Sequence, residues 1–191
     1  MNICVYGASS KTLDEKYITA VENLGQHLAQ RGHGLVFGGG ANGLMGAAAR
    51  GFTKGNAKDI VGVAPKFFNA DGILYEHCTE YIRPDTMRER KSILEERSDC
   101  FIAAPGGIGT FDELFEIATL RSLGRHSKPI VLYNVSGFYN PMLEMLRIYE
   151  GEGFLKNFEG LVFVSDDIEK IADYLESYTS SSLGVESFKN I

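Results

Sequence analysis

The sequence predicts an α/β fold in which one parallel sheet carries helices on both faces. Short apolar runs of strand length alternate along the chain with longer segments of helical periodicity, an order typical of doubly wound sheets. Two of these runs are followed by glycine-rich turns that enter a helical segment. Together these observations predict a single Rossmann-like domain, with its ligand site at the carboxyl ends of the strands.

Six apolar runs have the length of strands. One of them, from Cys100 to Ala104, is apolar throughout, which is typical of a strand buried on both faces. The predicted strands cover Asn2–Tyr6, Gly34–Phe37, Ile60–Ala64, Asp99–Ala104, Pro129–Tyr133 and Leu161–Val164.

Helices are predicted where apolar residues recur every three or four positions, as Phe111, Leu114, Phe115 and Ala118 do. The segment Pro65–Thr79 is rich in residues that favour turns, so we expect a loop there that can wall a site. The predicted helices cover Asp14–Arg31, Gly43–Gly55, Pro84–Arg97, Gly109–Gly124, Gly137–Glu150 and Asp166–Tyr178.

Length and charge limit the organisation and the partners. A chain of 191 residues without a linker-like stretch predicts one nucleotide-binding domain, over residues 1–178, and a Ser-rich C-terminal tail over 179–191. The formal net charge of -6 argues against broad electrostatic binding to nucleic acid or to an anionic membrane. We therefore expect a small-molecule partner.

The cysteines and histidines indicate neither disulfides nor a metal. Three widely spaced cysteines, with no signal-type segment at the start and no apolar run long enough to span a bilayer, favour reduced thiols and a cytoplasmic location. None of the cysteines has CxxC spacing, and the four histidines form no ligand pattern, so we expect no metal. These residues are Cys4, Cys78, Cys100, His27, His33, His77 and His126.

The most informative motif is the segment Pro105–Glu113, in which a glycine-dense turn joins a strand to a helix. Glycines allow backbone N–H groups to approach an anion closely, and a helix N-terminus adds free donors and a positive dipole end. We expect a phosphate cradle here, with Glu113 in the first helical turn as a catalytic acid. The alternative is that Glu113 only stabilises the helix start.

The earlier loop Gly38–Gly46 contains a GxGxxG pattern after the second strand. A dinucleotide fingerprint normally follows the first strand and has an acid about 20 residues later, at the end of the next strand. Here Asp59 precedes the next strand, so a dinucleotide site is disfavoured. Anion binding and close packing of the helix on the sheet both remain open for these glycines. The loop Gly7–Ser10 offers room and hydroxyl groups at the same edge.

The segment Arg83–Lys91 carries four cations against two acids. Such a run is often a solvated helix face. Alternatively, Arg90 and Lys91 bind the anionic or hydroxylated part of a ligand. Farther along, Glu116 lies one turn beyond Glu113, and Thr119 is a polar residue among apolar ones that can face the pocket.

Three motifs in order give the chain a resemblance to a known family. Gly38–Gly46 is similar to GGGxxGLMG, Met87–Lys91 to MxxRK and Pro105–Glu113 to PGGxGTxxE. These patterns, with their separation, resemble those of the Lonely guy (LOG) cytokinin-activating phosphoribohydrolases, which were long mislabelled as lysine decarboxylases. The similarity extends over roughly residues 2–175, and the combination is specific.

The resemblance implies hydrolysis of the N-glycosidic bond of adenosine-type 5'-monophosphates, to a free base and ribose 5-phosphate. It also implies a homodimer with sites near the subunit interface, and no cofactor. Arg90 and Glu113 match the family's catalytic pair. The positions that match substrate-binding residues are Lys91, Gly107, Ile108, Gly109, Thr110 and Thr119.

Three positions depart from the family pattern. Asp112 replaces the first Glu of an EE pair, Leu120 stands where many plant-like members have Trp, and Gly72 stands where a substrate-binding Glu is common, although Asp71 can supply a displaced carboxylate. The changes at Gly72 and Leu120 bear on the preference for the base or its N6 substituent.

Three other functions stay open. They are a broader nucleotide 5'-monophosphate nucleosidase in salvage, a non-catalytic carrier that binds a nucleotide or cofactor, and a hydride-transferring NAD enzyme. Nothing in the sequence identifies a pyridoxal-binding lysine with its supporting acid, which argues against a decarboxylase.

Overall fold

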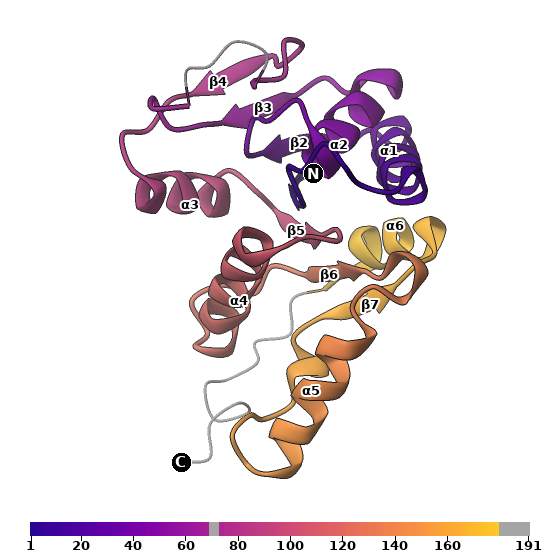
Figure 1. Ribbon diagram of the computed structural model, residues 1–191, viewed down its shortest axis with the longest axis vertical. Helices are drawn as coiled ribbons and strands as arrows, with labels where there is room; N and C mark the ends of the chain where they lie inside the picture. Colours follow the sequence, from indigo (N-terminus) through magenta and orange to yellow (C-terminus); the bar gives the residue numbers. More distant parts are fainter. Residues whose placement is uncertain (69–72, 180–191) are drawn as a thin grey trace.

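Seven parallel strands form one sheet in the order β4-β3-β2-β1-β5-β6-β7 (Figure 1). The structure is a computed structural model that describes residues 1–68 and 73–179. The strands are β1 (Asn2–Tyr6), β2 (Gly34–Phe37), β3 (Ile60–Val63), β4 (Glu80–Ile82), β5 (Cys100–Ala103), β6 (Ile130–Tyr133) and β7 (Phe163–Ser165). The predicted α/β, doubly wound architecture is confirmed.

Helices cover both faces of the sheet (Figure 1). One face is covered by α1 (Glu15–Gln30), α2 (Gly43–Lys54) and α6 (Ile168–Ser177), and the other by α3 (Met87–Glu96), α4 (Ile108–Ser122) and α5 (Asn140–Gly151). Two short 3-10 helices, η1 (Val135–Gly137) and η2 (Phe158–Gly160), precede α5 and β7.

The alternation of side chains along the strands divides the core in two. Ile3 and Val5 of β1 pack with α1 and α2, whereas Cys4 and Tyr6 pack with α3 and α4 on the other face. All four are at most 4% exposed. Because both faces are covered, the central strands are continuous apolar runs, which is why the sequence predicted them.

The predicted elements are confirmed with small differences at their ends. The sixth strand begins two residues later than predicted, at Phe163. Helix α5 begins at Asn140 rather than Gly137, because η1 and the left-handed Ser136 (φ 53°) precede it. Strand β4 was not predicted: it is only three residues long and none of them is buried. Of the predicted tail 179–191, all but residue 179 lies outside the described residues.

The strand order reverses between β1 and β5, and this switch point positions the site. The loops that follow β1, β2 and β5 are joined there by backbone hydrogen bonds. Ala8 N donates to Pro105 O over 3.1 Å, and Leu44 N donates to Ala8 O over 2.7 Å. The two glycine-rich turns therefore lie on either side of the loop after β1.

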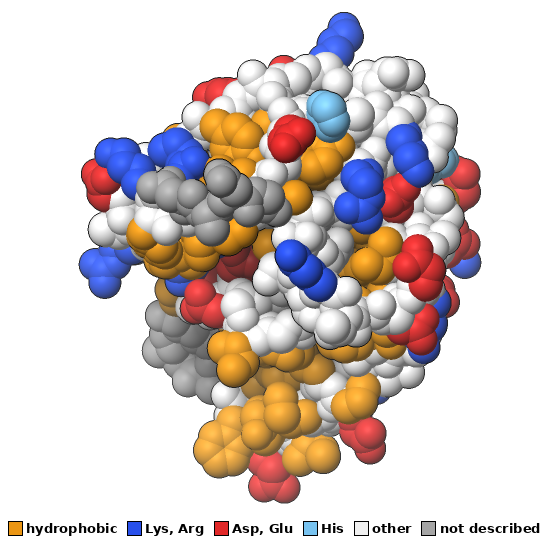
Figure 2. Space-filling model, turned by 45° about the horizontal axis from the view of Figure 1, so that its top comes forward, with side chains coloured by type: hydrophobic (Ala, Val, Ile, Leu, Met, Phe, Trp, Pro, Cys, Tyr) orange, Lys and Arg blue, Asp and Glu red, His pale blue; other side chains and the backbone are white. Residues whose placement is uncertain are grey.

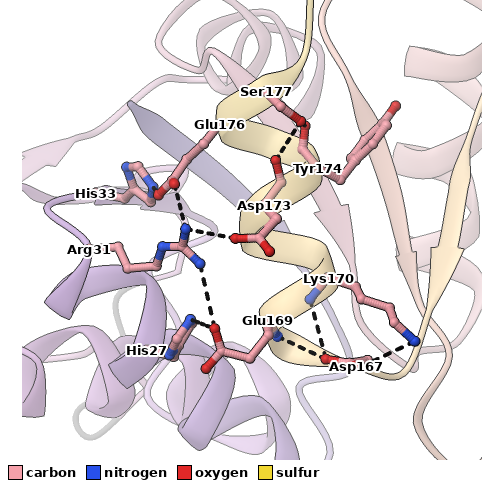
Figure 3. Close-up of polar contacts among 10 residues, drawn as sticks. All are labelled: His27, Arg31, His33, Asp167, Glu169, Lys170, Asp173, Tyr174, Glu176 and Ser177. Carbon is pink, nitrogen blue, oxygen red and sulfur yellow. Dashed lines mark hydrogen bonds and ion pairs between the residues drawn. The ribbon is translucent and has the colours of Figure 1, made fainter.

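A cluster of charged side chains ties α6 to the end of α1, away from the switch point (Figure 3). Arg31 donates to Asp173 over 2.8 Å and to Glu176 over 2.6 Å. His27 Nε2 lies 3.3 Å from a carboxylate oxygen of Glu169. The carboxylates of this cluster are partly exposed, so each ion pair alone contributes little to the free energy of unfolding. Together the pairs form a network.

We expect His33 to make the fold sensitive to acid. Burial lowers the pKa of His33, and its Nε2 lies 2.9 Å from Glu176. The pKa of His33 is lower in the folded protein than its ordinary value near 6.5, so the unfolded protein binds more protons as the pH falls. The free energy of unfolding is therefore highest above about pH 6.5 and decreases as the pH falls through the pKa of the folded protein. Hydrogen bonding to Arg31 lowers the pKa of Glu176, so this carboxylate stays ionised over that range.

Thermal unfolding between pH 8 and pH 5 checks this expectation. The wild-type Tm should fall as the pH drops below about 6.5, and His33→Asn should show a smaller fall. Parallel Tm curves for the two proteins would assign the acid sensitivity elsewhere, for example to His126, whose pKa burial also lowers.

Candidate active site

A cavity of about 670 Å³ opens at the carboxyl ends of β1, β2 and β5. It is large enough for a small-molecule ligand. Its walls come from the loops after these strands, from the first turns of α3 and α4, and from residues near β3 and β4. The lining includes Ser9, Ser10, Gly38, Gly40, Asn42, Met45, Phe68, Ile73, Leu74, Met87, Arg90, Gly107, Ile108, Gly109, Thr110, Asp112 and Glu113.

A buried ion pair between α3 and α4 forms part of this lining. Arg90 Nη1 donates to Glu113 Oε1 over 2.6 Å, and Arg90 Nε donates to Val63 O over 3.1 Å. The two side chains are only 8% and 11% exposed. With two of its donors engaged, the guanidinium is fixed and holds the carboxylate at the cavity wall.

Local sequence explains why Arg90 takes this position. Thr86 and Glu89 form a capping box that starts α3, so the register of the helix is set one turn before Arg90. At the end of β2, a Cβ on Gly38 would lie 2.3 Å from Arg90 Nη2. Gly38 therefore leaves the space that the guanidinium fills, which is a packing role.

Glu113 is a buried acid rather than a helix-start acid. The prediction that it lies in the first turn is wrong, because α4 begins at Ile108 and its first turn contains no acidic residue. Burial raises the pKa of Glu113 above its usual range, and Arg90 opposes that rise. A carboxyl group with a raised pKa, facing a cavity, is suited to take up and release a proton.

The N-terminus of α4 faces the cavity without a cap. Gly107 is the N-cap residue and supplies no side-chain hydrogen bond, so first-turn amides of Ile108 and Gly109 point out of the helix without a cap. Among the residues that the structure describes, a Cβ on Gly107 or Gly109 would meet no atom within 4 Å, whereas a Cβ on Gly106 would lie 2.1 Å from Thr110 Oγ1. Packing therefore explains Gly106 but not Gly107 or Gly109, and the open surface suits an anion.

Packing explains part of the loop Gly38–Gly46. Leu44 N and Met45 N, at the start of α2, both donate to Ala8 O. A Cβ on Gly46 would lie 1.9 Å from Ala41 O. Close packing of α2 therefore accounts for Gly46, whereas Gly38 and Gly40 line the cavity. The first amides of α2 are engaged, so the free helix start belongs to α4.

Lys91 and Thr119 lie in an adjoining groove of about 600 Å³ rather than in the cavity with Glu113. Lys91 Nζ lies 2.6 Å from Glu116 Oε2 and 3.2 Å from Asp112 Oδ2, and hydrogen bonding to Glu116 raises the pKa of Lys91. Leu120 lines the same groove. Ile108 and Asp112 line both spaces.

Six of the eight predicted catalytic and substrate-binding residues thus line the cavity, whereas Lys91 and Thr119 lie in the groove. Lining residues that the sequence did not single out include Met45, Phe68, Ile73 and Leu74. The adjacent pair Phe67-Phe68 in a segment predicted as a loop was the available signal, because exposed aromatic residues in a loop often line sites. Positions 71 and 72, where the displaced carboxylate was considered, lie outside the described residues.

Residues 45–175 match a sequence family described as "Possible lysine decarboxylase". The cytokinin riboside 5'-monophosphate phosphoribohydrolase LOG of Oryza sativa subsp. japonica is 36% identical over 181 residues, which cover 92% of this chain and 74% of the relative. LOG2 of Arabidopsis thaliana, with the same enzyme name, is 37% identical over 177 residues, or 92% and 83% of the two chains. The chain belongs to the LOG family.

Solved structures confirm the Rossmann-like fold of this LOG family member. The molybdenum cofactor carrier protein of Chlamydomonas reinhardtii superposes with a TM-score of 0.70 at 21% identity, covering 92% of this chain and 95% of the carrier. At that identity the likeness concerns the fold alone. No helix among residues 1–68 and 73–179 is long and apolar enough to cross a membrane.

Proposed function

We propose that this LOG family member hydrolyses the N-glycosidic bond of N6-substituted adenosine 5'-monophosphates, releasing the free base and ribose 5-phosphate. Relatives that carry the name of this activity match over most of the chain. The observation that carries the proposal is the buried Arg90–Glu113 pair, which shares one cavity with the uncapped start of α4.

The phosphate is proposed to lie on the amides of Gly107, Ile108, Gly109 and Thr110. A dianionic phosphate is favoured at a helix N-terminus by the free N–H donors and by the helix dipole. The Thr110 hydroxyl adds a further donor. Binding energy from this group fixes the ribose against the catalytic side chains, so that it contributes to the rate of cleavage and not only to affinity.

Glu113 is proposed to act at the anomeric carbon. When the bond between C1' and the base nitrogen breaks, its electron pair leaves with the base, and positive charge develops on the sugar. The carboxylate stabilises that charge and accepts a proton from the water that attacks C1'. Arg90 keeps the carboxylate in place. The departing base takes up a proton from solvent, and Glu113 returns its proton to solvent, so one water is consumed and the enzyme is restored.

Substitutions in the glycine turn separate packing from ligand binding. Gly109→Ala should not lower the free energy of unfolding, because the new Cβ meets open space and alanine is the better helix former. With Glu113→Gln also present, so that AMP is not consumed, it should weaken AMP binding by about tenfold, or about 1.4 kcal/mol. Gly106→Ala should lower stability by about 1–3 kcal/mol, because its Cβ would overlap Thr110. Urea unfolding measures the stability and calorimetric titration measures the AMP affinity. An AMP affinity that is unchanged by Gly109→Ala would contradict phosphate binding at this turn.

The activity is tested by incubation with AMP and with isopentenyladenosine monophosphate, followed by chromatography for free base. We expect base release from at least one of these nucleotides and none from adenosine, which lacks the phosphate. No base from either monophosphate would overturn the proposal. Strong cleavage of GMP, CMP or UMP would instead support a broader nucleosidase in salvage, and tight binding without turnover would support a carrier.

We also propose a homodimer in the cytoplasm. Figure 2 shows hydrophobic side chains gathered on the surface at the lower edge of the molecule. Met145, Ile148 and Tyr149 of α5 and the nearby Phe154 are 40–84% exposed, and large exposed apolar patches often mark subunit contacts. A second copy near the groove would bring Lys91 and Thr119 to a shared site. Light scattering after gel filtration tests the assembly; a monomer at micromolar concentration would contradict it.

A further inference from the structure

One side of the cavity is a wall built from the loop after β2 and from residues that precede β4. Ile73, Leu74 and Phe68 line this wall, together with Met45. Strands β2 and β5 lie on opposite sides of β1, so the wall stands across β1 from the start of α4. If the phosphate lies on α4 and C1' lies at Glu113, the wall is left for the base.

The wall consists of two segments bonded to each other. Leu74 forms an isolated antiparallel bridge with Gly40. Ala41 N donates to Ile73 O over 2.8 Å, and Tyr75 N donates to Gly39 O over 2.9 Å. The segment Ile73–Tyr75 is therefore docked on the glycine loop by three backbone contacts.

Tyr81 of β4 binds this junction from behind. Its hydroxyl oxygen lies 2.7 Å from Tyr75 O and 3.0 Å from Gly39 O. The single O–H is shared between these two acceptors, one carbonyl from each segment. Burial raises the pKa of Tyr81, which keeps the phenol protonated as a donor. The ring reaches the junction by crossing β3 at Gly62, where a Cβ would lie 2.4 Å from a ring carbon.

A second side chain beyond β4 holds the rest of the wall. Arg83 Nη2 lies 3.2 Å from Pro65 O and 3.3 Å from Phe68 O. The backbone that carries Phe68 is thereby fixed relative to β4. Tyr81 in the edge strand and Arg83 just after it thus support the wall at two points.

We propose that Tyr81 is a positioning residue that sets the shape of the base end of the nucleotide site. The inference rests on the proposed function. Tyr81 does not line the cavity, and its hydroxyl acts through Gly39 and Tyr75. Its loss should loosen the wall and leave the start of α4 and the Arg90–Glu113 pair in place.

The test compares ligands that share the phosphate and sugar but differ in the base. AMP and ribose 5-phosphate are titrated by calorimetry into Tyr81→Phe and its parent, both carrying Glu113→Gln so that AMP is not consumed. The loss of a hydrogen bond predicts about five- to tenfold weaker AMP binding, with ribose 5-phosphate affinity unchanged. In the Tyr81→Phe variant that keeps Glu113, and is therefore active, KM for AMP should rise while kcat stays within about twofold of the wild-type value.

Tyr133→Phe is the matched control. Tyr133 is a buried strand tyrosine whose hydroxyl donates to Ala20 O over 3.3 Å, outside the cavity lining; its removal should leave both affinities unchanged. Equal weakening of both ligands by Tyr81→Phe, or no weakening of AMP, would overturn the inference while leaving the proposed function intact. A Glu113→Gln parent that binds neither ligand would overturn the proposed function and this inference with it.

Discussion

Replacing Glu113 with glutamine is expected to lower kcat for AMP cleavage by about 10²- to 10⁴-fold, the contribution of a positioned acid–base group. The amide keeps the size of the side chain and an oxygen that can accept from Arg90, so the protein should fold. It loses the negative charge that stabilises the sugar cation and the basic oxygen that takes a proton from water. Initial rates of free base release measure the effect.

The binding of AMP separates chemistry from folding in this variant. The phosphate contacts at α4 are untouched, so the dissociation constant should change by less than about threefold. Glu96→Gln, at the exposed end of α3, is the control and should keep wild-type rates. A Glu113→Gln protein that retained more than a tenth of wild-type kcat would exclude Glu113 from the chemical step.

Replacing Arg90 with methionine is expected to destabilise the protein by about 3–5 kcal/mol at pH 8, the cost of leaving one partner of a buried pair uncompensated. Glu113 is only 11% exposed, so without Arg90 its charge has no adequate solvation. The absence of the guanidinium should raise the pKa of Glu113 further. Since a raised carboxyl pKa means that the folded state binds more protons, the destabilisation should shrink as the pH falls.

The double variant Arg90→Met, Glu113→Gln isolates the cause. It removes the orphaned charge and should recover much of the lost stability while remaining inactive. Urea unfolding at pH 8 and pH 5 measures both effects for the single and the double variant. A double variant as unstable as Arg90→Met would show that packing of the arginine stem, rather than the buried charge, determines the loss.

The central strands were predictable because burial on both faces leaves a plain sequence signal. Strand β4 was not, since its residues are partly or fully exposed and, within the described part of the chain, pair with β3 alone. Its one indirect signal was Gly62: a glycine inside a strand often marks the close approach of another group, here the ring of Tyr81. The consequence for the cavity wall followed only from the three-dimensional arrangement.

The residues of the site were predictable, but which of them lie next to each other was not. Arg90 and Glu113 are 23 residues apart on different helices, and only the family resemblance joined them before the structure did. The family resemblance assigned Lys91 and its neighbour Arg90 to one site, although helical periodicity separates them. Adjacent residues point to different sides of a helix, and α3 directs one side chain to the cavity and the other to the groove.

A crystal structure of the Glu113→Gln variant with AMP tests the central claim most directly. The account predicts the phosphate within hydrogen-bond distance of the amides of Gly107, Ile108, Gly109 and Thr110, with C1' next to residue 113 and the base against Ile73 and Leu74. A phosphate bound instead at the start of α2, or a C1' atom remote from residue 113, would contradict it.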